Sequence, residues 1–137
     1  MRTALGLLAV VGLLSLGGMV LFAFQKGDAP QFKNVSPEEF QKTVKEKPGL
    51  LLDVRTPKEF ASGRIAGATN IDFFGEHFKE EIAKLDKSKP VYVYCRSGGR
   101  SGKTMAQMES MGFTTVLNLD GGVLGWTKKG LPLEKPE

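Results

Sequence analysis

The chain has 137 residues, too few for more than one domain of ordinary size. Its formal net charge of +4 is a mild basic excess, without the dense run of Lys and Arg that a nucleic-acid-binding surface needs, so we expect no nucleic-acid partner. It holds a single cysteine, which excludes an internal disulfide.

The first 26 residues are predicted to form an export segment. No charged side chain occurs between Thr3 and Phe24. An uncharged stretch of this length can cross a bilayer core of about 30 Å as a helix, and it exceeds the apolar core of a cleaved secretory signal. Leu21-Phe22-Ala23 is a poor small-x-small cleavage site. We therefore favour a hydrophobic membrane-anchor helix at 1–26, with a cleaved signal peptide as the alternative.

The charge at the start of the chain bears on where the rest of it lies. Arg2 precedes the apolar run, and the positive-inside rule then places the remainder outside the membrane, facing the periplasm or the exterior. If the leader is cleaved, the expected location is the periplasm. Residues 27–31 are predicted to be a linker, and residues 32–137 one folded domain.

Strands and helices are expected to alternate along this domain. Ser36 has the features of a helix cap, because Pro37 and two acids follow it, and the helix should run to about Glu46. Leu50–Val54 is an apolar run ending next to an acid, typical of a strand buried on both faces. The other expected elements are strands at 32–35, 68–71, 91–94 and 115–119, and helices at 57–60, 76–85, 101–111 and around Trp126. The alternation predicts an α/β fold with a parallel sheet covered by helices on both faces.

The single cysteine directly follows the predicted strand at 91–94. The loop after Cys95 reads Arg96-Ser97-Gly98-Gly99-Arg100, and a helix is expected from Ser101. Paired glycines let the backbone curl until several N–H groups point to one centre. The helix amino terminus and the two arginines also favour negative charge there. The sequence therefore predicts a lowered thiol pKa and a resident thiolate at Cys95.

Two other chemistries use an anion-binding loop of this kind. A nucleotide-binding P-loop needs four residues between its glycines, and the run from Gly98 to Lys103 is one residue short. The tyrosine-phosphatase pattern has five residues between cysteine and arginine, whereas Cys95 and Arg100 have four between them. The shorter loop suits one added sulfur atom better than a tetrahedral phosphate.

The segment from Cys95 to Ser101 resembles the active-site loop of the rhodanese family, and three other segments match that family in order. These are Leu52-Asp53-Val54-Arg55 with Glu59-Phe60, the stretch GRIAGATNI at 63–71, and Leu119-Asp120-Gly121-Gly122 with Trp126. The family usually has histidine at the position of Arg64 and proline at that of Ala66. Both departures lie outside the cysteine loop.

The resemblance implies a five-stranded parallel sheet and a sulfurtransferase. Cys95 would attack the sulfane sulfur of a small anionic donor such as thiosulfate, become a persulfide, and pass the outer sulfur to a thiol, to cyanide or to an acceptor protein. The implied substrate-binding residues are Arg96, Ser97, Gly98, Gly99, Arg100 and Ser101. No cofactor and no metal is expected. A persulfide carrier or interaction module that relays sulfur between partner proteins is the alternative.

Several marked residues are expected to be structural. Near the site, the Asp53 carboxylate is expected to be fixed by backbone amides. Arg55 is expected to pair with a nearby acid, for which Glu59 is the candidate. We expect the pair Phe73-Phe74 to pack inside the domain. His77 and Trp126 are expected to be a surface residue and a packing residue, respectively.

Overall fold

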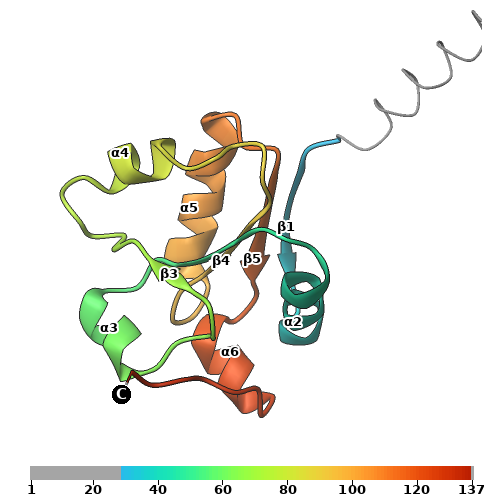
Figure 1. The fold of residues 1–137 in the computed structure, drawn as a ribbon, viewed down its shortest axis with the longest axis vertical. Helices are drawn as coiled ribbons and strands as arrows, with labels where there is room; N and C mark the ends of the chain where they lie inside the picture. The colour runs from blue at the N-terminus through green and yellow to red at the C-terminus, as the bar shows by residue number, and fades with distance from the viewer. Residues whose placement is uncertain (1–28, 137) are drawn as a thin grey trace, which may run out of the picture.

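The computed structural model describes residues 29–136 (Figure 1). The predicted export segment at 1–26 lies outside the described residues. Among residues 29–136, no helix is both long enough and apolar enough to cross a membrane.

Strands and helices alternate along the described chain, as predicted. The strands are β1 (Gln31–Val35), β2 (Leu50–Asp53), β3 (Thr69–Asn70), β4 (Val91–Tyr94) and β5 (Thr115–Leu119). The helices are α2 (Pro37–Glu46), α3 (Pro57–Ser62), α4 (Phe78–Ala83), α5 (Gly99–Ser110) and α6 (Gly122–Lys128).

The strands form one five-stranded sheet in the order β1-β5-β4-β2-β3, and every pair is parallel. This confirms the predicted α/β architecture. The chain leaves β2 towards β3 on one side and returns to β4 on the other side of β2. The carboxyl ends of β2 and β4 therefore meet near the middle of the sheet, the place where α/β proteins bind ligands.

The two faces of the sheet carry two separate hydrophobic cores, as a sheet covered on both sides requires. Along β4, Tyr92 and Tyr94 face one core, while Val91, Val93 and Cys95 face the other. The first core is closed by side chains of α2 and α6, and the second by side chains of α4 and α5. Helices α5 and α6 therefore cover opposite faces of the sheet; both are labelled in Figure 1.

Local signals in the sequence explain where the helices begin. The Ser36 side chain accepts a hydrogen bond from the Glu39 N–H (3.2 Å), and Pro37 occupies the first turn of α2. Thr56 caps α3 in the same way and exchanges hydrogen bonds with Glu59, which makes a capping box. These contacts fix the position of Glu59 on the first turn of α3.

Three elements are shorter than predicted, and the first of them, β2, ends at Asp53 and not at Val54. β3 covers Thr69–Asn70 and not 68–71, because this edge strand pairs with β2 over two residues only. α4 begins at Phe78 and not at residue 76, because a turn precedes it, in which the Asp72 carbonyl accepts from the Gly75 N–H (2.9 Å).

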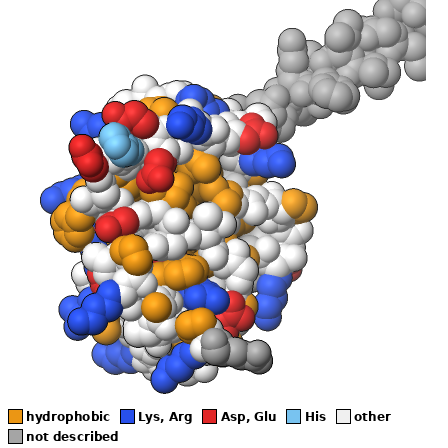
Figure 2. Space-filling model, turned by 60° about the vertical axis from the view of Figure 1, so that its left-hand side comes forward, with side chains coloured by type: hydrophobic (Ala, Val, Ile, Leu, Met, Phe, Trp, Pro, Cys, Tyr) orange, Lys and Arg blue, Asp and Glu red, His pale blue; other side chains and the backbone are white. Residues whose placement is uncertain are grey.

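The surface drawn in Figure 2 mixes charges of both signs. Basic and acidic side chains are interspersed around a hydrophobic area on this face, and the basic ones do not gather into one stripe.

Candidate active site

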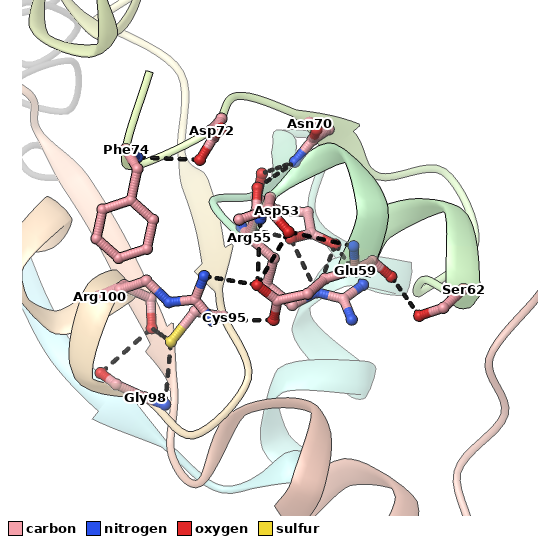
Figure 3. A network of polar contacts seen from close by, with 12 residues as sticks. Asp53, Arg55, Glu59, Ser62, Asn70, Asp72, Phe74, Cys95, Gly98 and Arg100 are labelled. Carbon is pink, nitrogen blue, oxygen red and sulfur yellow. Dashed lines mark hydrogen bonds and ion pairs between the residues drawn. The ribbon is translucent and has the colours of Figure 1, made fainter. Parts of the chain in front are cut away.

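The cysteine lies at the carboxyl end of the central strand β4. Tyr94, the last residue of β4, is in register with Asp53 at the end of β2. The parallel pairing thus brings Cys95 and the segment after Asp53 to the same edge of the sheet. Both were marked as site residues in the sequence, and the fold places them together (Figure 3).

The sulfur of Cys95 is buried and held by its own loop. Its side chain is 1% exposed. The Gly98 N–H donates to Sγ (3.1 Å), and the Ser101 hydroxyl donates to it as well (3.3 Å). Gly98 has φ of +103°, in the left-handed region that glycine adopts at little cost, which explains the glycine at this turn. Because α5 begins at the next residue, the sulfur faces the amino end of a twelve-residue helix.

These contacts act on the acidity of the thiol. Burial alone would raise the pKa of Cys95, because it disfavours the thiolate. The hydrogen bonds from the Ser101 side chain and from the amides of Ser101, Gly98 and Ser97 outweigh burial, so the pKa lies below its ordinary value of 9.0. The structure therefore agrees with the lowered thiol pKa expected from the sequence.

The Arg100 side chain is held by an acidic partner on α3. Its guanidinium makes a two-fold hydrogen-bonded pair with Glu59, with Nη1–Oε1 at 2.8 Å and Nη2–Oε2 at 2.9 Å. The Arg100 guanidinium also lies over the Phe74 ring, 5.6 Å from its centroid. The prediction that Glu59 pairs with Arg55 is wrong, because Arg100 takes this carboxylate.

Arg55 instead pairs with Asp53 in the interior. Its Nη2 lies 2.7 Å from Asp53 Oδ2, and both side chains are at most 5% exposed. The Arg55 N–H donates to Asp53 Oδ1 (2.8 Å), and Nη2 also donates to the Gly63 carbonyl (2.7 Å). Burial would lower the pKa of Arg55, but the hydrogen bonds and charge of Asp53 raise it overall. The pair joins β2 to the turn after α3 and so supports the floor of the site.

Sequence reasoning missed the support that α6 gives to the cysteine loop. The Val123 N–H donates to the Cys95 carbonyl (2.9 Å), and the Leu124 N–H donates to the Arg96 carbonyl (3.0 Å). Gly122 has φ of +57°, and a Cβ there would lie only 2.5 Å from the Arg96 carbonyl carbon and oxygen. The pair Gly121-Gly122 was the signal in the sequence that could have indicated this contact, because glycine is used where two backbones approach closely.

The remaining predicted site residues belong to the cysteine loop and face solvent. Arg96, Ser97 and Gly99 are exposed. Phe74 is 69% exposed, so the expectation that it packs inside is wrong; its ring is held on the surface by contacts with Arg100 and Phe73.

Three further expectations concern residues away from the loop. His77 is exposed at the start of α4, and Trp126 is buried, as expected. Arg64, one of the two departures from the rhodanese pattern, lies over the Phe60 ring at 4.5 Å and pairs with Glu134 at 3.5 Å. Across residues 29–136, no group of three or more His, Cys, Asp or Glu side chains is arranged to hold a metal ion.

Comparison with known sequences agrees with this geometry. Residues 36–129 match the family model described as "Rhodanese-like domain". A sulfurtransferase of Allochromatium vinosum is 39% identical over 88 residues, which cover 64% of this chain and 80% of that protein. Thiosulfate sulfurtransferase 16, chloroplastic, of Arabidopsis thaliana is 37% identical over 91 residues, covering 59% and 76%.

Solved structures share the architecture. A rhodanese-like domain protein from Staphylococcus aureus superposes with a TM-score of 0.65 at 29% identity, over 77% of this chain and 99% of that one. A rhodanese-related protein from Thermoplasma volcanium superposes with a TM-score of 0.67 at 25% identity, over 75% and 98%.

Proposed function

This chain belongs to the rhodanese-like family, and from that membership we propose that it is a sulfurtransferase which loads one sulfur atom onto Cys95 from a donor such as thiosulfate. The observation that carries the proposal is the environment of the sulfur. Sγ accepts hydrogen bonds from a loop amide and from the Ser101 hydroxyl, and its pKa is lowered.

The first step is a displacement at sulfur. The Cys95 thiolate attacks the outer sulfur of thiosulfate, a new S–S bond forms, and the old S–S bond breaks so that sulfite leaves with the bonding electron pair. The product on the protein is a persulfide anion, and the total charge is unchanged. We expect the loop that holds the thiolate to hold the outer sulfur as well, because the Gly98 N–H already donates to the Cys95 sulfur.

The second step returns the cysteine to its starting state. A thiolate or cyanide attacks the outer sulfur of the persulfide, and the Cys95 thiolate is the leaving group. Because the donor's product leaves before the acceptor reacts, the kinetics are expected to be ping-pong. The loop residues Arg96 to Ser101 would bind the donor and the persulfide, as proposed for them from the sequence.

The test is to measure sulfite release and thiocyanate formation from thiosulfate and cyanide, with Cys95→Ser as the paired variant. We expect the wild-type chain to release both products, and to gain the mass of one sulfur atom when thiosulfate alone is added. The serine variant should do neither. Equal turnover by the two proteins would rule out the proposed role of the thiol.

A second candidate is a persulfide carrier that delivers sulfur to a partner protein. The observation that favours it is the placing of Phe74 and Leu124, which are 69% and 48% exposed. Phe74 contacts Arg100, and Leu124 is bonded to the backbone of Arg96, so both lie at the rim of the cysteine loop. Exposed apolar side chains at such a rim suit a protein partner. A carrier would load one sulfur from thiosulfate but turn over slowly with cyanide, whereas an enzyme would do both.

A further inference from the structure

A cavity of about 360 Å³ opens on the surface between the start of α4 and the middle of α5. Its lining combines two aromatic rings, three charged side chains and one amide: Phe73, Phe78, Glu76, Lys79, Glu80 and Gln107. Aromatic contacts connect it to the cysteine loop, because the Phe73 ring packs on Phe74 (ring centroids 5.4 Å apart) and Phe74 lies against the Arg100 guanidinium (Figure 3). A group bound in this cavity would therefore lie beside the site of sulfur loading.

Gln107 gives the cavity a hydrogen-bond acceptor without a partner. Its side-chain oxygen Oε1 is buried and accepts no hydrogen bond from the described residues. A buried polar atom left without a hydrogen bond destabilises a fold, so such atoms are rare and call for an explanation. Because Gln107 lines the cavity, a ligand that carries an N–H donor would supply the missing bond.

The rim of the cavity carries more negative than positive charge. Glu76 and Glu80 are exposed there, against the single lysine Lys79. Within residues 29–136, none of these three side chains takes part in an ion pair. The only histidine of the chain, His77, precedes α4 and marks this place in Figure 2, where acidic side chains lie around it next to a hydrophobic area. The rim is thus suited to a cationic group.

An arginine side chain matches these features together. Its guanidinium is positively charged, carries several N–H donors in one plane, and stacks on aromatic rings. Phe73 and Phe78, with ring centroids 5.2 Å apart, supply the aromatic surface. A lysine ammonium would satisfy the charge but has no flat group to lie against the rings.

We propose that this cavity binds an arginine side chain of a partner protein whose cysteine accepts sulfur from Cys95. The inference rests on the proposed function and deepens it, because it assigns a docking place and a recognition chemistry to a protein acceptor. In the transfer step, the partner's thiolate attacks the outer sulfur of the Cys95 persulfide. A new S–S bond forms, the old one breaks, and the Cys95 thiolate leaves with the bonding electron pair.

The length of α5 sets the spacing that such a partner needs. Gln107 follows Gly99, the first residue of α5, by eight residues, so it lies about 12 Å along the helix from the cysteine loop. An extended segment of about four residues spans this distance at about 3.3 Å per residue. A suitable probe is therefore the peptide acetyl-Cys-Gly-Gly-Gly-Arg-amide.

The experiment measures sulfur transfer from the full chain, loaded with thiosulfate, to this peptide and to a second one with citrulline in place of arginine. Citrulline keeps the shape of arginine and lacks its charge. We expect the arginine peptide to react about fivefold faster, the factor that two unit charges about 4 Å apart contribute in water. Glu80→Gln should bring this ratio of rate constants close to one. Equal rates for the two peptides with the wild-type chain would overturn the inference.

Glu81→Gln is the matched control. It removes the same charge from the next residue of α4, which does not line the cavity, and should leave the ratio unchanged. The assay is run at about 0.15 M salt, where distant exposed charges are screened. If Glu80→Gln and Glu81→Gln lowered the ratio equally, the preference would come from the general charge of α4 and not from the cavity.

Gln107→Leu separates a binding role from a structural one. Leucine keeps the side chain apolar and removes the unpaired oxygen, so the variant should be at least as stable as the wild-type chain in urea. It should nevertheless lower the ratio of the two rate constants, because the guanidinium loses an acceptor. A variant of lower stability with an unchanged ratio would show that the amide is structural and would overturn its assigned role.

A binding measurement distinguishes failure of this inference from failure of the proposed function. If the full chain loads no sulfur, the proposed function fails, and the peptide acetyl-Ser-Gly-Gly-Gly-Arg-amide still reports on the cavity. We expect it to shift the ring-proton NMR signals of Phe73 and Phe78 more than its citrulline form does. Equal shifts would overturn the inference. Equally tight binding of acetyl-arginine methylamide alone would overturn the docking role, because the cavity would then be a site for a small cation.

Discussion

Ser101 is the side chain on which the acidity of the thiol most directly depends. Its hydroxyl donates to the Cys95 sulfur and also lies 3.3 Å from the Gly98 carbonyl. It is fully buried, so no water replaces it when it is removed. A hydroxyl in this position stabilises the thiolate more than the neutral thiol. In the proposed reaction, the Cys95 nucleophile is thus prepared by its own loop and helix, and this proposal includes no separate base.

Replacing Ser101 by alanine is expected to raise the thiol pKa and slow sulfur loading. The thiolate is lost as the pH falls through the thiol pKa, so the variant's rate profile should move to higher pH. Below that pKa the rate should fall about tenfold, since a hydrogen bond to a charged group is worth about 1.5 kcal/mol. The measurement is the rate of Cys95 alkylation and of sulfite release between pH 5 and 10, a range of about five units around the ordinary thiol value.

Ser110→Ala is the matched control, because Ser110 lies on the same helix and its hydroxyl bonds only to the Ala106 carbonyl (3.3 Å). Its profile should coincide with that of the wild-type chain. A Ser101 variant with an unshifted profile would show that the loop amides alone set the pKa.

The sequence predicted which residues form the site better than it predicted which side chains pair with each other. Cys95 and its loop were recognised because their types and spacing are local. The pairing of Arg100 with Glu59 joins residues 41 positions apart, and nothing local tells which of two arginines reaches that carboxylate. Phe74 was expected inside because of its apolar ring, yet it lies in the turn before α4 and stacks on an arginine at the surface.

Helix α6 is the element that holds the active loop from behind. Its first two N–H groups after Gly122 bond to the carbonyls of Cys95 and Arg96. The backbones are so close that no side chain fits at residue 122. The last helix of the domain therefore supports the candidate site through its backbone. Within residues 29–136, no α6 side chain forms a hydrogen bond with the Cys95 sulfur.

Gly122→Ala is expected to destabilise the domain and abolish sulfur loading. The added Cβ would clash with the Arg96 carbonyl and would also meet an unfavourable φ of +57°. Together these should cost about 3 kcal/mol or more in the free energy of unfolding. Urea unfolding and sulfite release measure the two effects.

Gly130→Ala separates the clash from the backbone strain. Gly130 also has positive φ (+75°), but a Cβ there meets no atom within 4 Å. This variant should lose about 1 kcal/mol and keep its activity. If the two variants behaved alike, the close approach of α6 to the loop would not be what matters.

The elements themselves were largely predictable. Ser36 and Pro37 mark the start of α2, and the apolar runs that became β2 and β4 are what a sheet buried on both faces needs. The differences lie where tertiary contacts set the length. The edge strand β3 is limited by its partner β2, and the start of α4 by the turn at Gly75.

At the scale of the whole molecule, the location of the domain stays a prediction, because residues 1–26 lie outside the described part. The apolar leader remains the basis for proposing export. Reporter fusions to the carboxyl terminus of the full chain test it: alkaline phosphatase should be active and a fluorescent protein that matures only in the cytoplasm should stay dark. Removing residues 1–26 should reverse both results. A fluorescent full-length fusion would contradict the proposal.

The order of the strands has a consequence for how the protein is made. β1 is the first strand of the sheet to be synthesised, yet its one partner in the sheet is β5, and paired residues such as Asn34 and Asn118 are 84 positions apart. At ~5–20 residues per second, a ribosome needs roughly 4 to 17 seconds to span that gap. Throughout this interval the nascent chain carries an unmatched strand edge. From the synthesis of Cys95 until that of α6 (Gly122–Lys128), the cysteine loop also lacks the helix that later braces it. Chaperone occupancy should therefore be highest before residue 119 emerges.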